Sequence, residues 1–254
     1  MPDAARPLIL ATNDDGVHAP GLRMLEAALA EVGDVWTIAP EGPQSAQSHS
    51  LTLHKPLRLK PRGERRWAAS GTPTDCVFLA VNHLLPRPPD LVVSGINHGA
   101  NIGSDVTYSG TVAAVLEAAL MGLPGIAFSH LDHRAPDFTD GAAYATHIAR
   151  EVLDRGLPDG VHLNVNFPAV AAGEAKGVKV TELGRRFYDN KIIVKEDPRG
   201  TPYYWIGGDG FHHDDIPGSD CNAVVDGWIS VCALTCRPQA AGGTELLRGW
   251  GIER

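Results

Sequence analysis

The sequence predicts an α/β protein with a doubly wound, mostly parallel, Rossmann-like sheet between two layers of helices. Three observations carry this prediction. Short apolar runs recur along the chain, stretches with helical spacing separate them, and the runs end in polar or glycine-rich turns. Alternation of this kind is typical of a parallel sheet covered on both faces. With 254 residues, 43% of them hydrophobic, the chain is long enough for one large domain.

The first half of the chain supplies the alternating elements. Apolar spacing at Leu22, Leu25 and Leu29 predicts a helix that Gly33 ends. Thr72 before Pro73 is typical of a capped helix start. The expected order is strand 8–11, helix 21–32, strand 35–39, helix 73–85, strand 91–94, helix 111–121 and strand 125–128.

The pattern changes beyond about residue 159. We expect strands at 161–166, 178–181 and 228–234, a β-ribbon at 187–206, a short helix near Asp220 and a helical tail. No low-complexity linker divides the chain, so we interpret residues 1–254 as one domain. Its core would span about 1–183 and 219–236, with a protruding ribbon and loop at about 187–217 and a tail at about 244–254.

Composition argues against several classes of protein. Lys and Arg total 22 against 30 Asp and Glu, and this net charge of −8 disfavours a nucleic-acid duplex or an anionic membrane as partner. The longest nearly uncharged stretch, 111–128, contains Glu117 and Pro124 and is no membrane span. The N-terminus lacks a secretory pattern, and the four cysteines form no C-x-x-C pair. We expect reduced thiols and a cytoplasmic protein.

Two acids stand side by side where the first strand ends. Asp14 and Asp15 converge only if the chain turns there, and Gly16 allows such a turn. Neighbouring carboxylates repel strongly unless a cation or a proton lies between them. The pair is either a cation site or a solvated turn.

Other polar groups follow the next strands. The stretch 95–103 carries Asn97 and Asn101 and matches neither the dinucleotide nor the NTP glycine fingerprint. It is either a ligand loop or a flexible crossover. Ser109, Gly110 and Thr111 precede a helix whose first N–H groups suit a phosphate, although such residues often serve only as a cap.

These groups would meet at one edge, because ligands of open α/β sheets bind beyond the carboxyl ends of strands. The loop 43–50, after the second strand, would bring serine hydroxyls to the same edge. Oxygen ligands of this kind suit Mg²⁺ or Mn²⁺ better than zinc. The more metal-like string His212-His213-Asp214-Asp215 lies far away in sequence. We expect it in an exposed loop, with contact to the substrate or to another subunit as the alternative. We also expect a solvated turn at 62–66.

Eight short motifs follow one another along nearly the whole chain: Asn13-Asp14-Asp15-Gly16, Ser48-His49-Ser50-Leu51-Thr52, Gly71-Thr72-Pro73-Thr74-Asp75, Ser94-Gly95-Ile96-Asn97, Tyr108-Ser109-Gly110-Thr111, Leu163-Asn164-Val165-Asn166, Gly184-Arg185-Arg186 and Gly218-Ser219-Asp220. In this order they resemble the motifs of the SurE family of metal-dependent 5′/3′-nucleotidases.

The resemblance implies one divalent ion per subunit, Mg²⁺ or Mn²⁺, or Ca²⁺ in crystals. Its ligands would be Asp14, Asp15, Ser45 and Asn97. The loop departs from the family pattern at Gly42-Pro43-Gln44, which leaves Ser48 as a rival to Ser45. The resemblance also implies a homodimer or homotetramer, assembled through the ribbon at 187–206 and an exchanged tail at 244–254.

The resulting hypothesis is hydrolysis of nucleoside 5′- and 3′-monophosphates by an activated water. Asp14 would orient or deprotonate that water and Asp15 would chiefly bind the ion. Asn101, Ser109, Gly110 and Thr111 would hold phosphate oxygens, and Asn101 would thereby join the acids as a catalytic group. Two alternatives stay open: a phosphoaspartyl phosphatase, which adjacent acids disfavour, and a nucleotide sensor that binds without hydrolysis.

Overall fold

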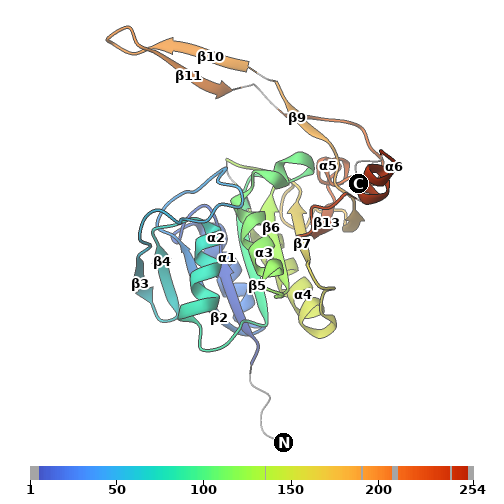
Figure 1. Cartoon of the computed structure of the whole chain (residues 1–254). Helices are drawn as coiled ribbons and strands as arrows, with labels where there is room; N and C mark the ends of the chain where they lie inside the picture. Colours follow the sequence, from blue (N-terminus) through green and yellow to red (C-terminus); the bar gives the residue numbers. More distant parts are fainter. Residues whose placement is uncertain (1–5, 135, 190, 208–210, 241, 251–254) are drawn as a thin grey trace, which may run out of the picture.

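The computed structural model describes residues 6–134, 136–189, 191–207, 211–240 and 242–250. These residues form a nine-stranded sheet covered by helices and two small two-stranded sheets that extend away from it (Figure 1). The predicted α/β fold with a mostly parallel sheet is therefore confirmed. Residues 251–254 of the predicted tail, and 190 and 208–210 of the predicted ribbon and loop, lie outside the described ranges.

The order of strands in the main sheet is β3-β4-β2-β1-β5-β6-β7-β13-β8. From β4 to β7 all neighbours are parallel, whereas β3 and β13 pair antiparallel with β4 and β7. The chain leaves β1 on one side for β2 and returns on its other side at β5, so the order reverses between β1 and β5. The bounds are β1 Leu8–Thr12, β2 Asp34–Pro40, β3 Leu59–Gly63, β4 Arg66–Ala69, β5 Leu91–His98, β6 Gly125–His130, β7 Val161–Phe167, β8 Val178–Thr181 and β13 Ile229–Thr235.

Helices cover both faces of this sheet. Helix α1 (Pro20–Leu29) packs beside α4 (Thr139–Arg155), and α2 (Pro73–Leu79) packs beside α3 (Gly110–Leu120) on the opposite face (Figure 1). Side chains of β1 alternate between the two layers, as the pleat of a strand requires. Ile9 belongs to the core under α1 and α4, whereas Leu10 belongs to the core under α2 and α3.

The start of α2 follows its sequence signals. The Thr72 hydroxyl accepts the Asp75 N–H at 3.1 Å, and the Asp75 carboxylate accepts the Thr72 N–H at 2.9 Å, which completes a capping box. The regular helix ends at Leu79 and continues as a π-helix, Ala80–Leu84, so the predicted helix 73–85 is found with a change of winding. Short elements complete the body: a 3₁₀ helix Gly103–Thr107, α5 Asp220–Val225 and α6 Gly243–Gly249.

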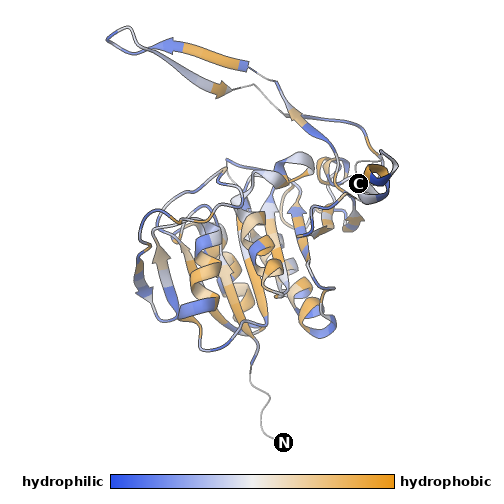
Figure 2. Ribbon diagram, in the orientation of Figure 1, coloured by the Kyte–Doolittle hydropathy of each residue, from blue (hydrophilic) through white to orange (hydrophobic). Residues whose placement is uncertain are grey.

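The predicted ribbon is present as two successive antiparallel pairs. Strand β9 (Arg186–Tyr188) pairs with β12 (Phe211–His213), and β10 (Lys191–Glu196) pairs with β11 (Pro202–Gly207). The β10–β11 arm extends away from the body in Figure 1, and most of β10 is hydrophobic in Figure 2. The expectation of an exposed loop at 212–215 is wrong for His212 and His213, which lie in β12.

The sequence patterns did not predict helix α4 or the β3–β4 hairpin. Helix α4 buries mostly small residues such as Ala142, Ala145 and Ala149, which produce a weak apolar stripe. The β3–β4 hairpin was not predicted, because β3 is almost entirely exposed. The solvated turn expected at 62–66 is found for residues 62–65, which are exposed and include the turn of this hairpin. Arg66 is partly buried and bonds Glu26 and the Val17 carbonyl oxygen. All four cysteines are free thiols, as expected. No helix in the described ranges combines the length and apolar character needed to cross a bilayer.

Candidate active site

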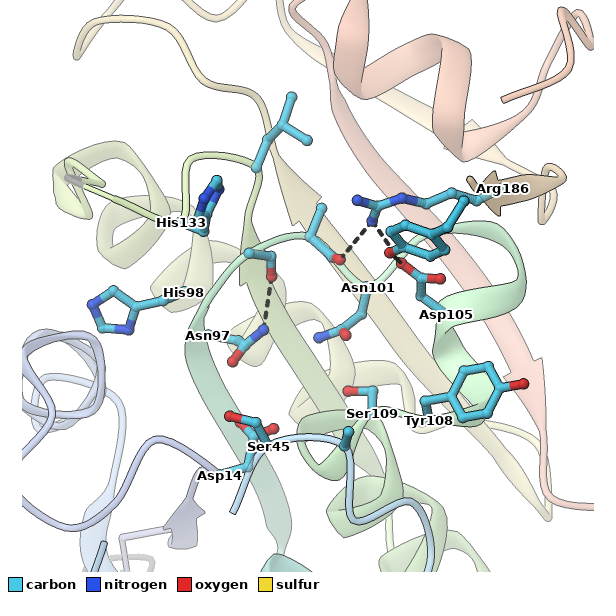
Figure 3. A pocket seen from close by; sticks show the side chains of 15 residues that line it. Asp14, Ser45, Asn97, His98, Asn101, Asp105, Tyr108, Ser109, His133 and Arg186 are labelled. Carbon is cyan, nitrogen blue, oxygen red and sulfur yellow. Dashed lines mark hydrogen bonds and ion pairs between the residues drawn. The ribbon is translucent and has the colours of Figure 1, made fainter. Parts of the chain in front are cut away.

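The carboxyl ends of β1 and β5 adjoin where the strand order reverses. The two strands pair in parallel, with Thr12 opposite Ser94. Beyond them the chain continues to Asp14 on one side and to Asn97 on the other. A cavity of about 550 Å³ opens at this edge (Figure 3). Its position is the one where open α/β sheets bind ligands.

The structure places most of the predicted site residues around this cavity. Those that line it are Asp14, Ser45, Asn97, Asn101 and Ser109, drawn together in Figure 3. Thr111 and Gly110 lie directly behind Asp14, in contact with it. Asp15 lies apart from the lining and contacts His98 instead.

Asp14 is a buried carboxylate, with 5% of its surface exposed. Its Oδ1 accepts a hydrogen bond of 2.5 Å from the Thr111 hydroxyl. Burial raises the pKa of Asp14 to about 6; the Thr111 hydrogen bond opposes that rise, and the charge of Asp15 adds to it. A carboxylate that is both desolvated and repelled by its neighbour gains from a cation at its side.

Helix α3 begins against Asp14 because Gly110 has no side chain. A Cβ at Gly110 would lie 2.9 Å from the Cβ of Asp14, which is closer than real side chains approach. The Ser109 hydroxyl accepts the Val112 N–H at 3.1 Å and so caps the helix. The N–H groups of Gly110 and Thr111 belong to the first turn, which has no intrahelical acceptors for them. This end of α3 suits an anion.

Asp15 is oriented by His98, a residue that the sequence analysis did not single out. Its Oδ2 accepts the backbone N–H of His98 at 3.2 Å and lies 3.0 Å from the ring Nδ1. His98 also lines the cavity. The only signal in the sequence was its place next to Asn97, in the stretch that follows the predicted strand 91–94.

The two asparagines are held in different ways. The amide nitrogen of Asn97 donates to the Gly99 carbonyl at 2.7 Å, which leaves the amide oxygen as the atom suited to a cation. The Asn101 amide nitrogen donates to the Ser129 hydroxyl at 2.7 Å, and its backbone N–H donates to Asn166 Oδ1 at 2.8 Å. Since an amide nitrogen carries two protons, Asn101 retains one donor for a ligand.

The geometry separates the two candidate serines. Ser45 lines the cavity, and the neighbouring Gln44 N–H donates to the Asp14 carbonyl at 2.7 Å. The Ser48 hydroxyl donates to the Thr107 carbonyl at 2.7 Å. This arrangement favours Ser45 over Ser48 as the serine ligand.

Another part of the cavity is lined by residues to which the sequence analysis assigned no role. Arg186, at the base of the ribbon, forms an ion pair of 2.7 Å with Asp105 and donates to the Ala100 carbonyl (Figure 3). The Tyr188 hydroxyl donates to the same Asp105 carboxylate at 2.5 Å. Tyr108 and His133 also line the cavity. Arg186 and Tyr108 stood within recognised motifs, but nothing in the sequence indicated that the ribbon reaches the cavity.

The donor set is built from oxygens. Within the described ranges, no cluster of three or more His, Cys, Asp or Glu side chains is placed to hold a metal ion. The set that lines the cavity at the strand ends instead combines the carboxylate of Asp14 with the neutral oxygens of Ser45 and Asn97. The carboxylate of Asp15, outside this lining, is near enough for its charge to raise the pKa of Asp14. Such oxygens fit a hard divalent cation, and the elevated pKa of Asp14 shows that its negative charge is poorly compensated by protein groups alone.

Comparisons with known proteins assign the chain to a family. The family described as "Survival protein SurE" matches residues 9–190. The chain is 49% identical to the 5′-nucleotidase SurE of Myxococcus xanthus over 247 residues, which cover 96% of this chain and 94% of the relative. It is also 49% identical to the 5′-nucleotidase SurE of Geobacter sulfurreducens over 245 residues, with 96% and 94% covered. The crystal structure of the SurE protein from Aquifex aeolicus superposes with a TM-score of 0.85 at 37% identity, over 96% of this chain and 100% of that one. The chain therefore belongs to the SurE family.

Proposed function

We propose that this protein is a 5′-nucleotidase that hydrolyses nucleoside monophosphates to nucleoside and phosphate with one divalent cation per subunit. The observation that carries the proposal is the buried Asp14, which faces a 550 Å³ cavity beside the start of α3. Relatives at 49% identity that carry the name 5′-nucleotidase support the same activity. Hydrolysis of 3′-monophosphates is part of the proposal.

The oxygen donors of the site and the poorly compensated negative charge of Asp14 fit a divalent cation. Asp14, Asp15, Ser45 and Asn97 would hold Mg²⁺ or Mn²⁺, or Ca²⁺ in crystals. When bound, such a cation neutralises charge that builds up on phosphate oxygens and lowers the pKa of a water molecule.

The chain's own side chains and backbone amides would bind the phosphate and activate the water. Ser109 lines the cavity. The first amides of α3, at Gly110 and Thr111, would direct the positive ends of their N–H bonds toward a bound phosphate. The second N–H of the Asn101 side-chain amide would donate a hydrogen bond to another phosphate oxygen. Asp14 would also orient the attacking water or take its proton. Together these donors would stabilise the charge of the transition state.

Phosphate release from AMP tests the proposal. Wild-type protein with Mn²⁺ should release phosphate, and an EDTA-treated sample should not until Mn²⁺ is restored. A panel of 5′- and 3′-mononucleotides with Mg²⁺, Mn²⁺ and Ca²⁺ then defines selectivity. Saturable AMP binding without phosphate release would refute hydrolysis and favour a sensor, and a trapped covalent phosphoenzyme would favour the phosphoaspartyl route.

We further propose that the protein acts in the cytoplasm as a homodimer or homotetramer. The β10–β11 arm supports assembly, because Ile192, Trp205 and Ile206 are between 58% and 93% exposed on it. Ile192 and Ile206 are opposite each other across the ribbon. Light scattering should give a dimer or tetramer, and a variant with both isoleucines changed to Asp should be a monomer. A monomeric wild-type protein would contradict the proposal.

A further inference from the structure

Helix α3 contains a buried charge that neither the fold nor the proposed reaction explains. Glu117 lies in the second half of the helix and is 6% exposed. The other residues of Gly110–Leu120 are glycine, threonine and apolar residues. Burying a carboxylate in such surroundings is costly unless a partner compensates it. The residue that contacts Glu117 therefore indicates the role of this buried carboxylate.

That partner is His49, whose ring Nε2 lies 2.7 Å from Glu117 Oε2. The His49 side chain is itself 29% exposed, so the pair lies at the boundary between protein and solvent. His49 belongs to the loop 41–58 between β2 and β3, which also carries Ser45. The pair thus joins the loop of the serine to the helix whose first turn faces the cavity.

The loop has a conformation that needs external support. Ala46 and Ser48 have φ values of 57° and 53°, in the left-handed region that residues other than glycine rarely adopt. Gln44 N–H holds the near side of this segment to the Asp14 carbonyl. On the far side, Ser48 bonds the carbonyl oxygens of Thr107 and Tyr108, and His49 bonds Glu117. Of these contacts, the one made by His49 reaches a carboxylate of α3.

We propose that the His49–Glu117 pair is a positioning contact, which fastens the loop 44–49 to α3 and thereby keeps Ser45 directed at the cation. The inference rests on the proposed function, because it assigns a purpose to the position of Ser45. Both positioning residues lie outside the cavity, since neither His49 nor Glu117 is part of its lining. Coupling of this kind between a ligand and its supporting partners typically changes metal affinity by about 10- to 100-fold.

Three variants separate this role from a general effect on stability. His49→Ala removes the contact. His49→Gln keeps an N–H donor at a similar reach without the ring. His54→Ala is the matched control, because His54 is an exposed histidine of the same loop with no side-chain hydrogen bond or ion pair in the described residues. Each variant is examined as the full chain by hydrogen exchange of peptides covering 44–52 and by Mn²⁺ titration.

We expect His49→Ala to exchange faster in 44–52 than wild type, with α1 and α4 unchanged, and to bind Mn²⁺ about tenfold more weakly. His49→Gln should recover most of both properties, and His54→Ala should match wild type. Wild-type exchange and Mn²⁺ affinity in His49→Ala would overturn the inference, as would a uniform increase of exchange over the whole chain. Failure of the wild-type protein to bind Mn²⁺ or hydrolyse AMP would instead refute the proposed function, while the exchange of 44–52 still reports whether the pair fastens the loop.

Discussion

Replacing Asp14 with Asn should make the cation-free protein more stable at neutral pH while it removes activity. Asp14 is desolvated and close to Asp15, and burial raises its pKa from 3.8 to about 6. The folded chain therefore binds the proton of this carboxyl more tightly than the unfolded chain does. Ionisation of Asp14 then costs stability that the neutral amide does not lose, and Asn still accepts the Thr111 hydrogen bond through its oxygen.

The magnitude follows from the two pKa values. A rise from 3.8 to about 6 corresponds to a destabilisation of about 3 kcal/mol once both states are ionised. The destabilisation is absent well below pH 3.8 and grows as the pH rises from 3.8 to about 6. Above that upper value it is complete. The expected gain in unfolding free energy for Asp14→Asn is thus about 3 kcal/mol at pH 7.5 and about half of that at pH 5.

Urea denaturation in EDTA at pH 5 and pH 7.5 measures the gain directly. Asp154→Asn is the matched control, because Asp154 is an exposed acid on α4, and its substitution should shift neither midpoint appreciably. Added Mn²⁺ should stabilise wild type more than Asp14→Asn, since the variant lacks one of the two carboxylates that attract the cation. A variant that is no more stable than wild type at pH 7.5, or a gain that does not change with pH, would refute the reasoning.

Three substitutions test the surroundings of Asp14. Asp15→Asn should lose at least 100-fold in AMP hydrolysis with little change in melting temperature; near wild-type turnover would contradict its role as a ligand. Gly110→Ala should lower kcat for AMP, because its Cβ would meet Asp14 at 2.9 Å; unchanged kinetics would show that the helix start moves freely. Ser109→Ala should cost about 1 kcal/mol in urea unfolding through the lost cap and should raise KM for AMP; a loss of stability at unchanged KM would leave Ser109 as a cap alone.

Much of the candidate site follows from the sequence because parallel strands place their carboxyl ends at one edge. Asp14 and Asn97 each follow an apolar run, and α3 begins after the polar, glycine-rich stretch that continues from β5. The meeting of the two side chains therefore needs only the strand order. The same argument brings Ser45 to this edge from the end of β2. Whether Ser45 or Ser48 turns toward the cavity depends on left-handed backbone at Ala46 and Ser48, which no sequence pattern indicated.

Other features depend on contacts that local patterns do not encode. Arg186 reaches Asp105 only because the ribbon begins over the 3₁₀ helix, and neither periodicity nor turn chemistry specifies that approach. His98 holds Asp15 through the extension of β5 beyond the predicted end at 94. Helix α4 buries alanines rather than leucines, and the small side chains conceal its apolar face.

Anomalous scattering from crystals soaked in Mn²⁺ tests most directly whether the strand ends hold a cation. We predict one strong manganese peak per subunit against the carboxylates of Asp14 and Asp15, which is lost in crystals of Asp14→Asn. A soaked wild-type crystal with no peak at these carboxylates, grown from protein that hydrolyses AMP, would contradict the account.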